Sequence, residues 1–149
     1  MKIAIGCDHG GLPLKETCIK ALESLGYDYI DCGTYTQDSV DYPDYAAKVC
    51  EKILNKEADK GILLCGTGIG IGVAANKFKG IFCAHVTDKF SAQMASEHNN
   101  ANVISMGARI TSKEDAYEFV RIFFTTDFAG GRHCNRLEKI AEIENKNFK

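Results

Sequence analysis

The chain has 149 residues, of which 45% are hydrophobic and 26% are charged, and its formal net charge at pH 7 is −2. A chain of this length can bury a stable core without metal ions or disulfides, so we expect residues 1–149 to form a single domain. The slightly negative charge and the scattered lysines argue against a nucleic-acid or membrane partner, because such partners usually require a basic patch.

Short β-rich runs alternate with segments of helical period, which is typical of βαβ units. Runs such as ILLC (62–65) are apolar throughout, as in parallel strands that are covered on both faces. We therefore predict an α/β protein with a doubly wound, Rossmann-like fold and a five-stranded parallel sheet. Strands are expected at 2–7, 27–33, 61–66, 80–86 and 102–107, with helices at 14–26, 44–55, from the glycine loop to about 78, and at 88–98.

Two more helices are expected after the last strand, at about 112–125 and 132–146. The final helix extends past the five-strand unit and carries an apolar stripe. That stripe could dock on a second subunit or on the chain's own sheet. It is formed by Leu137, Ile140, Ala141 and Ile143.

The seven cysteines form an odd set without a CxxC pair, which argues against a disulfide framework and against a zinc site. The chain has no apolar leader and no run that approaches the roughly 18 apolar residues of a membrane span. We therefore expect a cytoplasmic protein with free thiols and no bound metal. The cysteines are residues 7, 18, 32, 50, 65, 83 and 134.

The stretch ILLCGTGIGIGVAANK (62–77) places Cys65 at a strand end, directly before a glycine-rich loop. Ligands of open α/β sheets bind at the carboxyl ends of strands, where Asp8 and His9 also follow the first strand. Glycines allow backbone N–H groups to approach an oxyanion, and a helix N-terminus favours a thiolate. With the Thr67 hydroxyl, this arrangement suits a thiol base that removes a proton next to a carbonyl. A buried structural cysteine is the alternative.

Three familiar phosphate motifs do not fit this loop. The dinucleotide pattern GxGxxG would need glycine in place of Ile71 or Val73, and no GK[ST] sequence exists for a P-loop. A cysteine phosphatase loop would need an arginine six residues after Cys65, where Ile71 stands. The sequence therefore disfavours nicotinamide, nucleoside-triphosphate and phosphocysteine chemistry.

Arg132 and Arg136 lie four residues apart in AGGRHCNRLE (129–138), a spacing that forms a fork for phosphate on one helix face. A solvated helix start is the alternative. His98 ends a helix, where it could act as an acid or base in opening a sugar ring or simply contact the helix dipole. We interpret His85 as a core or strand-end residue and the six cysteines other than Cys65 as structural.

Five motifs resemble the ribose-5-phosphate isomerase B family, which belongs to the sugar-phosphate isomerase group that includes galactose-6-phosphate isomerase. In chain order they are GCDHGG (6–11), DYPDYA (41–46), CGTGIGIGVAANK (65–77), HNNANV (98–103) and GGRHCNR (130–136). The resemblance implies the aldose–ketose isomerisation of ribose 5-phosphate to ribulose 5-phosphate in the pentose phosphate pathway. It also implies an enediolate intermediate and no metal or organic cofactor.

The resemblance also implies roles for individual residues. Cys65 would move the proton from C2 to C1, the Thr67 hydroxyl and the loop amides would stabilise the enediolate, and His98 would assist ring opening. The substrate-binding residues implied are Asp8, His9 and Asn99 for the sugar hydroxyls, Arg109, Arg132 and Arg136 for the phosphate, Asp41 and Tyr42 in the pocket wall, and Gly66, Gly68, Ile69 and Gly70 in the loop.

Members of this family are homodimers or homotetramers with a site shared between subunits. The resemblance therefore implies that the region of His98, Asn99 and Arg109 comes from the partner. One branch of the family has a glutamate base where Ile71 stands, so this chain matches the branch with a thiol base. Asn100 replaces an acid that many relatives carry.

Three other functions remain open at this stage. The first is a hexose-phosphate isomerase acting on allose 6-phosphate or galactose 6-phosphate. The second is a non-catalytic regulator that binds a sugar phosphate. The third is a thiol hydrolase in which His9 activates Cys65.

Overall fold

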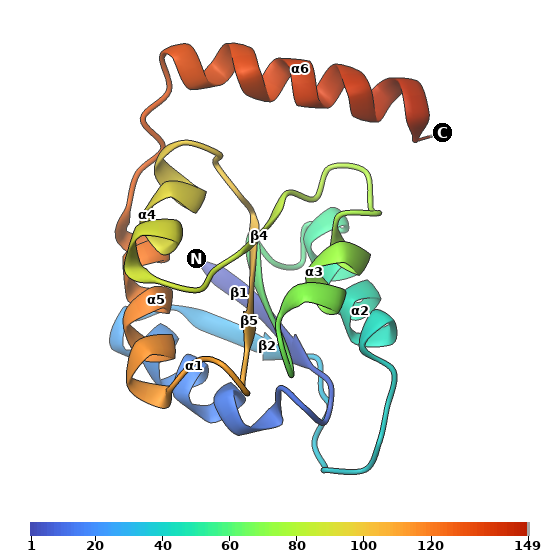
Figure 1. Cartoon of the computed structure of the whole chain (residues 1–149), viewed down its shortest axis with the longest axis vertical. Helices are drawn as coiled ribbons and strands as arrows, with labels where there is room; N and C mark the ends of the chain where they lie inside the picture. The colour runs from blue at the N-terminus through green and yellow to red at the C-terminus, as the bar shows by residue number, and fades with distance from the viewer. Residues whose placement is uncertain (149) are drawn as a thin grey trace.

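A computed structural model describes residues 1–148 and shows one parallel sheet with helices on both faces (Figure 1). The order of the strands is β2-β1-β3-β5-β4. The chain therefore places β2 on one side of β1 and the three later strands on the other side, and ligands of such sheets bind where the direction changes. The strands are β1 (Lys2–Cys7), β2 (Asp28–Asp31), β3 (Lys60–Cys65), β4 (Cys83–His85) and β5 (Val103–Gly107).

Two hydrophobic layers hold the helices on the sheet. One layer joins α1, α4 and α5 to one face, and the other joins α2 and α3 to the opposite face. The strands at the centre are apolar on both sides because both faces are covered, which confirms the predicted doubly wound sheet. The helices are α1 (Leu12–Ser24), α2 (Tyr42–Leu54), α3 (Ile69–Ala75), α4 (Lys89–Glu97), α5 (Lys113–Thr125) and α6 (Arg132–Asn147).

Several elements are shorter than predicted. The edge strands β2 and β4 cover only part of 27–33 and 80–86. Helix α3 ends at Ala75 rather than near residue 78. The side chain of Asn76 explains this early end, because its Nδ2 donates to the Cys83 carbonyl at 2.9 Å and its Oδ1 accepts from the Cys83 amide at 2.8 Å. These bonds fix the turn toward β4.

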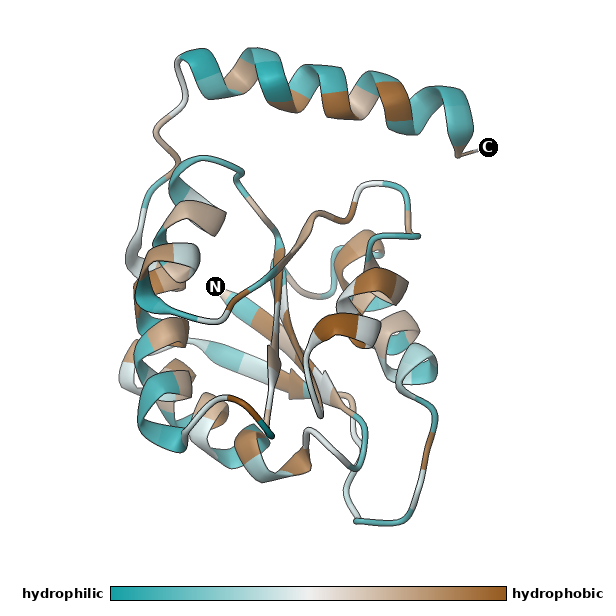
Figure 2. Ribbon diagram, viewed as in Figure 1, coloured by the Kyte–Doolittle hydropathy of each residue, from teal (hydrophilic) through white to brown (hydrophobic). Residues whose placement is uncertain are grey.

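The last helix, α6, lies across one end of the molecule, as predicted for an extended C-terminal helix (Figure 1). Apolar and polar residues alternate along it (Figure 2). It packs partly on its own chain: the Gly80 amide donates to Glu144 Oε1 at 2.9 Å, and Leu137 and Ile140 line a hollow with Phe82. Ile143 remains 63% exposed. Among the described residues, no helix is both long and apolar enough to cross a membrane.

Candidate active site

Close contacts of glycines with neighbouring backbone join the loops that follow β1, β3 and β5. A Cβ on Gly11 would clash with the carbonyl of Leu64, and a Cβ on Gly107 would clash with the backbone of Thr67. Only glycine permits such close approach of one chain segment to another. The loops around Cys65 are therefore packed against each other at the carboxyl edge of the sheet, as the sequence predicts.

Cys65 is the last residue of β3 and is only 4% exposed. Its Sγ accepts a hydrogen bond from the Gly68 amide at 3.0 Å. Gly68 has a φ of 81°, a left-handed conformation that favours glycine. The loop therefore curls back so that one of its own N–H groups points at the sulfur, and an N–H donor stabilises a thiolate.

The Thr67 hydroxyl lies in the same loop. Its Oγ1 accepts from the Ile69 amide at 3.1 Å, so its own O–H remains a donor for a ligand. The amides of Gly68 and Ile69 are thus bonded inside the loop. This differs from the simple picture of a loop with every N–H facing substrate, and it makes the hydroxyl of Thr67 the more available donor.

Four other thiols are held in the protonated form by burial. Desolvation raises the pKa of Cys7 to about 11 and the pKa values of Cys18, Cys50 and Cys83 to about 12, so these thiols stay protonated near neutral pH. The Cys7 thiol donates a hydrogen bond to the Thr34 carbonyl. These cysteines act as small buried hydrophobes, which supports their interpretation as structural residues.

Asp8 and His9 follow β1 and lie in the adjoining loop. Asp8 is 7% exposed, and its Oδ1 accepts from the Gly11 amide at 2.9 Å. The Nδ1 atom of His9 accepts from the Val40 amide at 3.2 Å. An accepting Nδ1 carries no proton, so the neutral ring presents its N–H at Nε2.

The segment after Val40 brings Tyr42 to the same site. A Cβ on Gly70 would lie only 2.7 Å from Tyr42 Cζ, so the phenol ring packs directly on the glycine loop. Asp41 is exposed at the N-cap of α2, where its carbonyl accepts from the Asp44 amide. Of the DYP motif, Tyr42 thus lies directly against the glycine loop.

Arg109 lies over the glycine loop of its own chain, which corrects the expectation that it comes from a partner with His98. A Cβ on Gly66 would lie 3.1 Å from the guanidinium carbon, and the Arg109 amide donates to the Gly66 carbonyl at 2.9 Å. The reason is sheet order: β5 pairs with β3, so the residues after each strand meet.

His98 and Asn99 lie far from Cys65 within one chain. They precede β5, whereas Cys65 is the last residue of β3, and these two strands are paired and parallel. A strand of this length spans roughly 16 Å. Figure 1 accordingly shows the end of α4 beside α6, at the opposite end of the sheet from the loop after β3. One chain therefore does not bring its own His98 to its own Cys65.

The start of α6 brings His133 and two arginines close to His98, whose Nε2 lies 3.4 Å from the Glu97 carboxylate. The rings of His98 and His133 stack, while Arg132 and Arg136 are exposed on the same helix. Desolvation, together with His98 and the two arginines, lowers the pKa of His133. Within residues 1–148, no carboxylate lies within 4.0 Å of the guanidinium groups of Arg109, Arg132 or Arg136.

Comparison with known proteins decides the family. The sequence pattern of the ribose/galactose isomerase family matches residues 3–140. The chain is 42% identical to ribose-5-phosphate isomerase B of Escherichia coli (strain K12) over 145 residues, which is 97% of each protein. It belongs to the ribose-5-phosphate isomerase B family. This membership confirms the isomerase class that the five motifs predict.

Solved structures of the family agree with the fold. Ribose-5-phosphate isomerase B of Clostridium thermocellum has a TM-score of 0.95 at 46% identity, over 98% of this chain and 99% of that one. The enzyme of Mycoplasma genitalium, solved with bound ribulose-5-phosphate, has a TM-score of 0.92 at 38% identity, over 98% of this chain and 97% of that one. The α/β fold is therefore that of the ribose-5-phosphate isomerase B family.

His85, interpreted from the sequence as a core or strand-end residue, ends a strand and makes a contact with the glycine loop that the sequence did not predict. His85 is the last residue of β4, and its Nε2 lies 2.9 Å from the Thr67 carbonyl oxygen. It is exposed, so it is not a core residue. Its position at a carboxyl strand end was the available signal, because β4 ends at the same edge of the sheet as β3.

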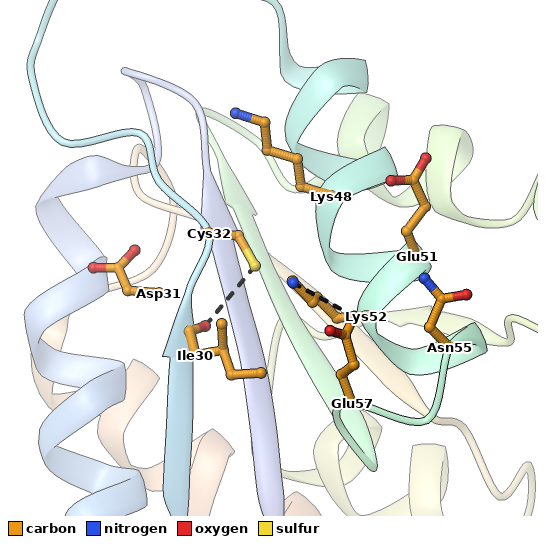
Figure 3. A pocket seen from close by; sticks show the side chains of 8 residues that line it. All are labelled: Ile30, Asp31, Cys32, Lys48, Glu51, Lys52, Asn55 and Glu57. Atoms are coloured by element: carbon orange, nitrogen blue, oxygen red, sulfur yellow. Dashed lines mark hydrogen bonds and ion pairs between the residues drawn. The ribbon is translucent and has the colours of Figure 1, made fainter.

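A separate hollow of about 350 Å³ lies between β2 and α2 (Figure 3). Its wall includes an ion pair between Lys52 and Glu57 and the thiol of Cys32, which donates to the Ile30 carbonyl. Desolvation raises the pKa of Cys32, so this thiol is a poor base at neutral pH. The carboxylate of Asp31 pairs instead with Lys15 at 3.0 Å. None of the site residues predicted from the sequence lines this hollow.

Proposed function

We propose that this isomerase interconverts ribose 5-phosphate and ribulose 5-phosphate, with residues 1–149 acting as one sugar-phosphate isomerase domain. The names of the Escherichia coli and Clostridium thermocellum relatives support this substrate. The described residues include no group of three or more His, Cys, Asp or Glu arranged around a metal ion. We further propose that the reaction needs no cofactor and takes place in the cytoplasm, where free thiols persist.

Cys65 is the base in this proposal. Its thiolate removes the proton from C2 of the open-chain aldose, which leaves an enediolate with the negative charge on O1. The proton of the O2 hydroxyl then passes to O1, and the thiol returns its proton to C1 as the C2–O bond becomes the ketose carbonyl, which restores the thiolate. The observation that carries this assignment is the Gly68 amide, which donates to Cys65 Sγ at 3.0 Å. That contact stabilises the negative sulfur before the proton moves, and the Thr67 hydroxyl stabilises the enediolate oxygen.

The other half of the site comes from a second copy of the chain. His98 and Asn99 lie at the opposite edge of the sheet from Cys65, so a homodimer or homotetramer is needed to bring both sets of residues to one substrate. In this arrangement the partner's His98 opens the sugar ring. Its arginine fork at 132 and 136 binds the phosphate together with Arg109 of the first copy.

The first test compares wild type, Cys65→Ala and the control Cys32→Ser in buffer treated with a chelator. Loss of the base is expected to lower kcat about 10²- to 10⁴-fold while substrate binding is retained, because general-base catalysis contributes about that much. Cys32→Ser should remain active. A fully active Cys65→Ala variant would remove the thiol from the chemistry.

The same assay separates the alternative substrates. Turnover of allose 6-phosphate or galactose 6-phosphate in preference to ribose 5-phosphate would indicate a hexose-phosphate isomerase. Binding of every sugar phosphate without turnover would indicate a regulator. Either result would overturn the proposed reaction.

A further inference from the structure

One peptide group beside Cys65 has a hydrogen bond at each of its two ends. His85 Nε2 lies 2.9 Å from the carbonyl oxygen of Thr67, and the amide of the next residue, Gly68, lies 3.0 Å from Cys65 Sγ. A carbonyl oxygen can only accept, so Nε2 of His85 carries a proton and donates it. The Thr67 carbonyl and the Gly68 amide belong to the same peptide plane.

The surrounding backbone holds this peptide in place. Gly107 packs directly on the Thr67 backbone, and a Cβ on Gly68 would lie 2.7 Å from the carbonyl carbon of Met106. His85 itself is held by β4, where it pairs with Ser105 of β5. The imidazole, the peptide and the sulfur are therefore positioned by neighbouring ends of three strands.

A donor at the carbonyl end of a peptide polarises it and makes its N–H a better donor. We propose that His85 is a positioning residue for the reaction: it orients and polarises the Thr67–Gly68 peptide so that the amide of Gly68 stabilises the Cys65 thiolate. This inference rests on the proposed role of Cys65 as the base. It assigns His85 an action through the peptide, without contact with substrate.

The alternative is that His85 only anchors the glycine loop. The two roles predict different effects on the reactivity of Cys65 Sγ. An anchor alone would affect access of reagents to Cys65 at every pH, whereas a polarising donor affects the fraction of thiolate near neutral pH.

The test uses His85→Leu, which removes the donor, and His85→Gln, whose amide N–H can occupy the place of Nε2. The rate at which iodoacetamide alkylates Cys65 is followed by mass spectrometry of the peptide that contains it, which separates it from the other thiols. The readout is the ratio of the rates at about pH 7 and about pH 9.5, because only the thiolate reacts.

For His85→Leu we expect this ratio to fall about two- to fivefold, the range that follows from partial weakening of one charge-assisted hydrogen bond. His85→Gln should restore it, and kcat should follow the ratio while KM for ribose 5-phosphate changes little. An unchanged ratio in His85→Leu, or an equal fall in both variants, would overturn the inference. Because alkylation requires no turnover, it gives an answer even if Cys65→Ala proves active and the proposed base is wrong.

Discussion

The imidazole of His98 stacks on that of His133, with the ring centres 4.1 Å apart and the planes inclined by 19°. The Ala129 amide also donates to the Glu97 carbonyl at 2.9 Å. These contacts join the end of α4 to the connection before α6. The arginines on the first turns of α6 thereby lie close to His98, so the residues proposed for ring opening and for phosphate binding share one corner of the molecule.

Removal of the His133 ring should make the start of α6, with Arg132 and Arg136, less well ordered relative to His98. We expect His133→Ala to raise KM for ribose 5-phosphate about three- to tenfold, because ordering of the phosphate-binding arginines then costs part of the binding energy. His133→Phe keeps a stacking ring and should stay near wild type. Steady-state kinetics of both variants measure this. Equal KM values for alanine and phenylalanine would show that the stacking contributes nothing.

The same histidine predicts a pH dependence of stability. Desolvation and the nearby cations lower the pKa of His133 in the folded protein below its ordinary value of about 6.5. As the pH falls through that value, the unfolded chain takes up a proton that the folded chain resists, so folding stability decreases. Thermal unfolding at about pH 7.5 and pH 5.5 should show a smaller acid-induced decrease of Tm for His133→Phe than for wild type. An equal decrease of Tm in both proteins would exclude His133 as a source of the acid-induced loss of stability.

The sequence predicts that several residues of this site lie together, because strands and their ends can be recognised from local residue patterns. Cys65, Asp8 and His9 follow predicted parallel strands, and the carboxyl ends of such strands necessarily share one edge of the sheet. The order of the strands is a long-range property, however. Only the pairing of β5 with β3 shows that Arg109 lies over its own chain's Gly66 and not in a partner's site.

The contact of His85 with the glycine loop was missed for a related reason. Its strand, IFCAHV (81–86), is apolar enough to suggest a core position, and nothing local shows that β4 is only three residues long at the sheet edge. The bond to the Thr67 carbonyl joins residues 18 positions apart in the sequence. Contacts of this kind depend on how two loops pack, which residue spacing does not reveal.

The tautomer of His9 can be tested with a pair of amides. His9→Asn places an amide near the Nδ1 position, where it can still accept from the Val40 amide, but it has no donor at the position of Nε2. His9→Gln places its N–H near that position. We expect KM for ribose 5-phosphate to rise about three- to tenfold more in the asparagine variant, the cost of one lost hydrogen bond. The reverse order would mean that His9 acts through Nδ1.

Complementation between inactive variants tests the shared site. Cys65→Ala lacks the base, and the double variant Arg132→Ala with Arg136→Ala lacks the phosphate fork, so each alone should be nearly inactive. A mixed dimer contains one site with an intact Cys65 and an intact fork. After unfolding and refolding of an equal mixture, we expect about a quarter of wild-type activity, because half the dimers are mixed and each has one good site of two. Activity no greater than that of the separate variants would show that each chain holds a complete site.

Gly68 and Gly26 have similar φ values. A comparison of alanine variants at these two positions therefore separates the effect of packing at the glycine loop from the effect of backbone strain. Gly68 and Gly26 have φ values of 81° and 76°, so alanine at either position costs about 1 kcal/mol of strain. A Cβ at Gly26 meets no atom within 4 Å, whereas at Gly68 it lies 2.7 Å from the Met106 carbonyl carbon.

Gly68→Ala should therefore lose about 1–3 kcal/mol more folding stability than Gly26→Ala, as expected for an overpacked contact between two backbones. It should also lower kcat, because a shift of the Thr67–Gly68 peptide moves the N–H away from Cys65 Sγ. Urea unfolding and steady-state kinetics of the two variants measure both effects. If Gly68→Ala matched Gly26→Ala in stability and in kcat, the backbone contact with β5 would have no part in holding the amide on the sulfur.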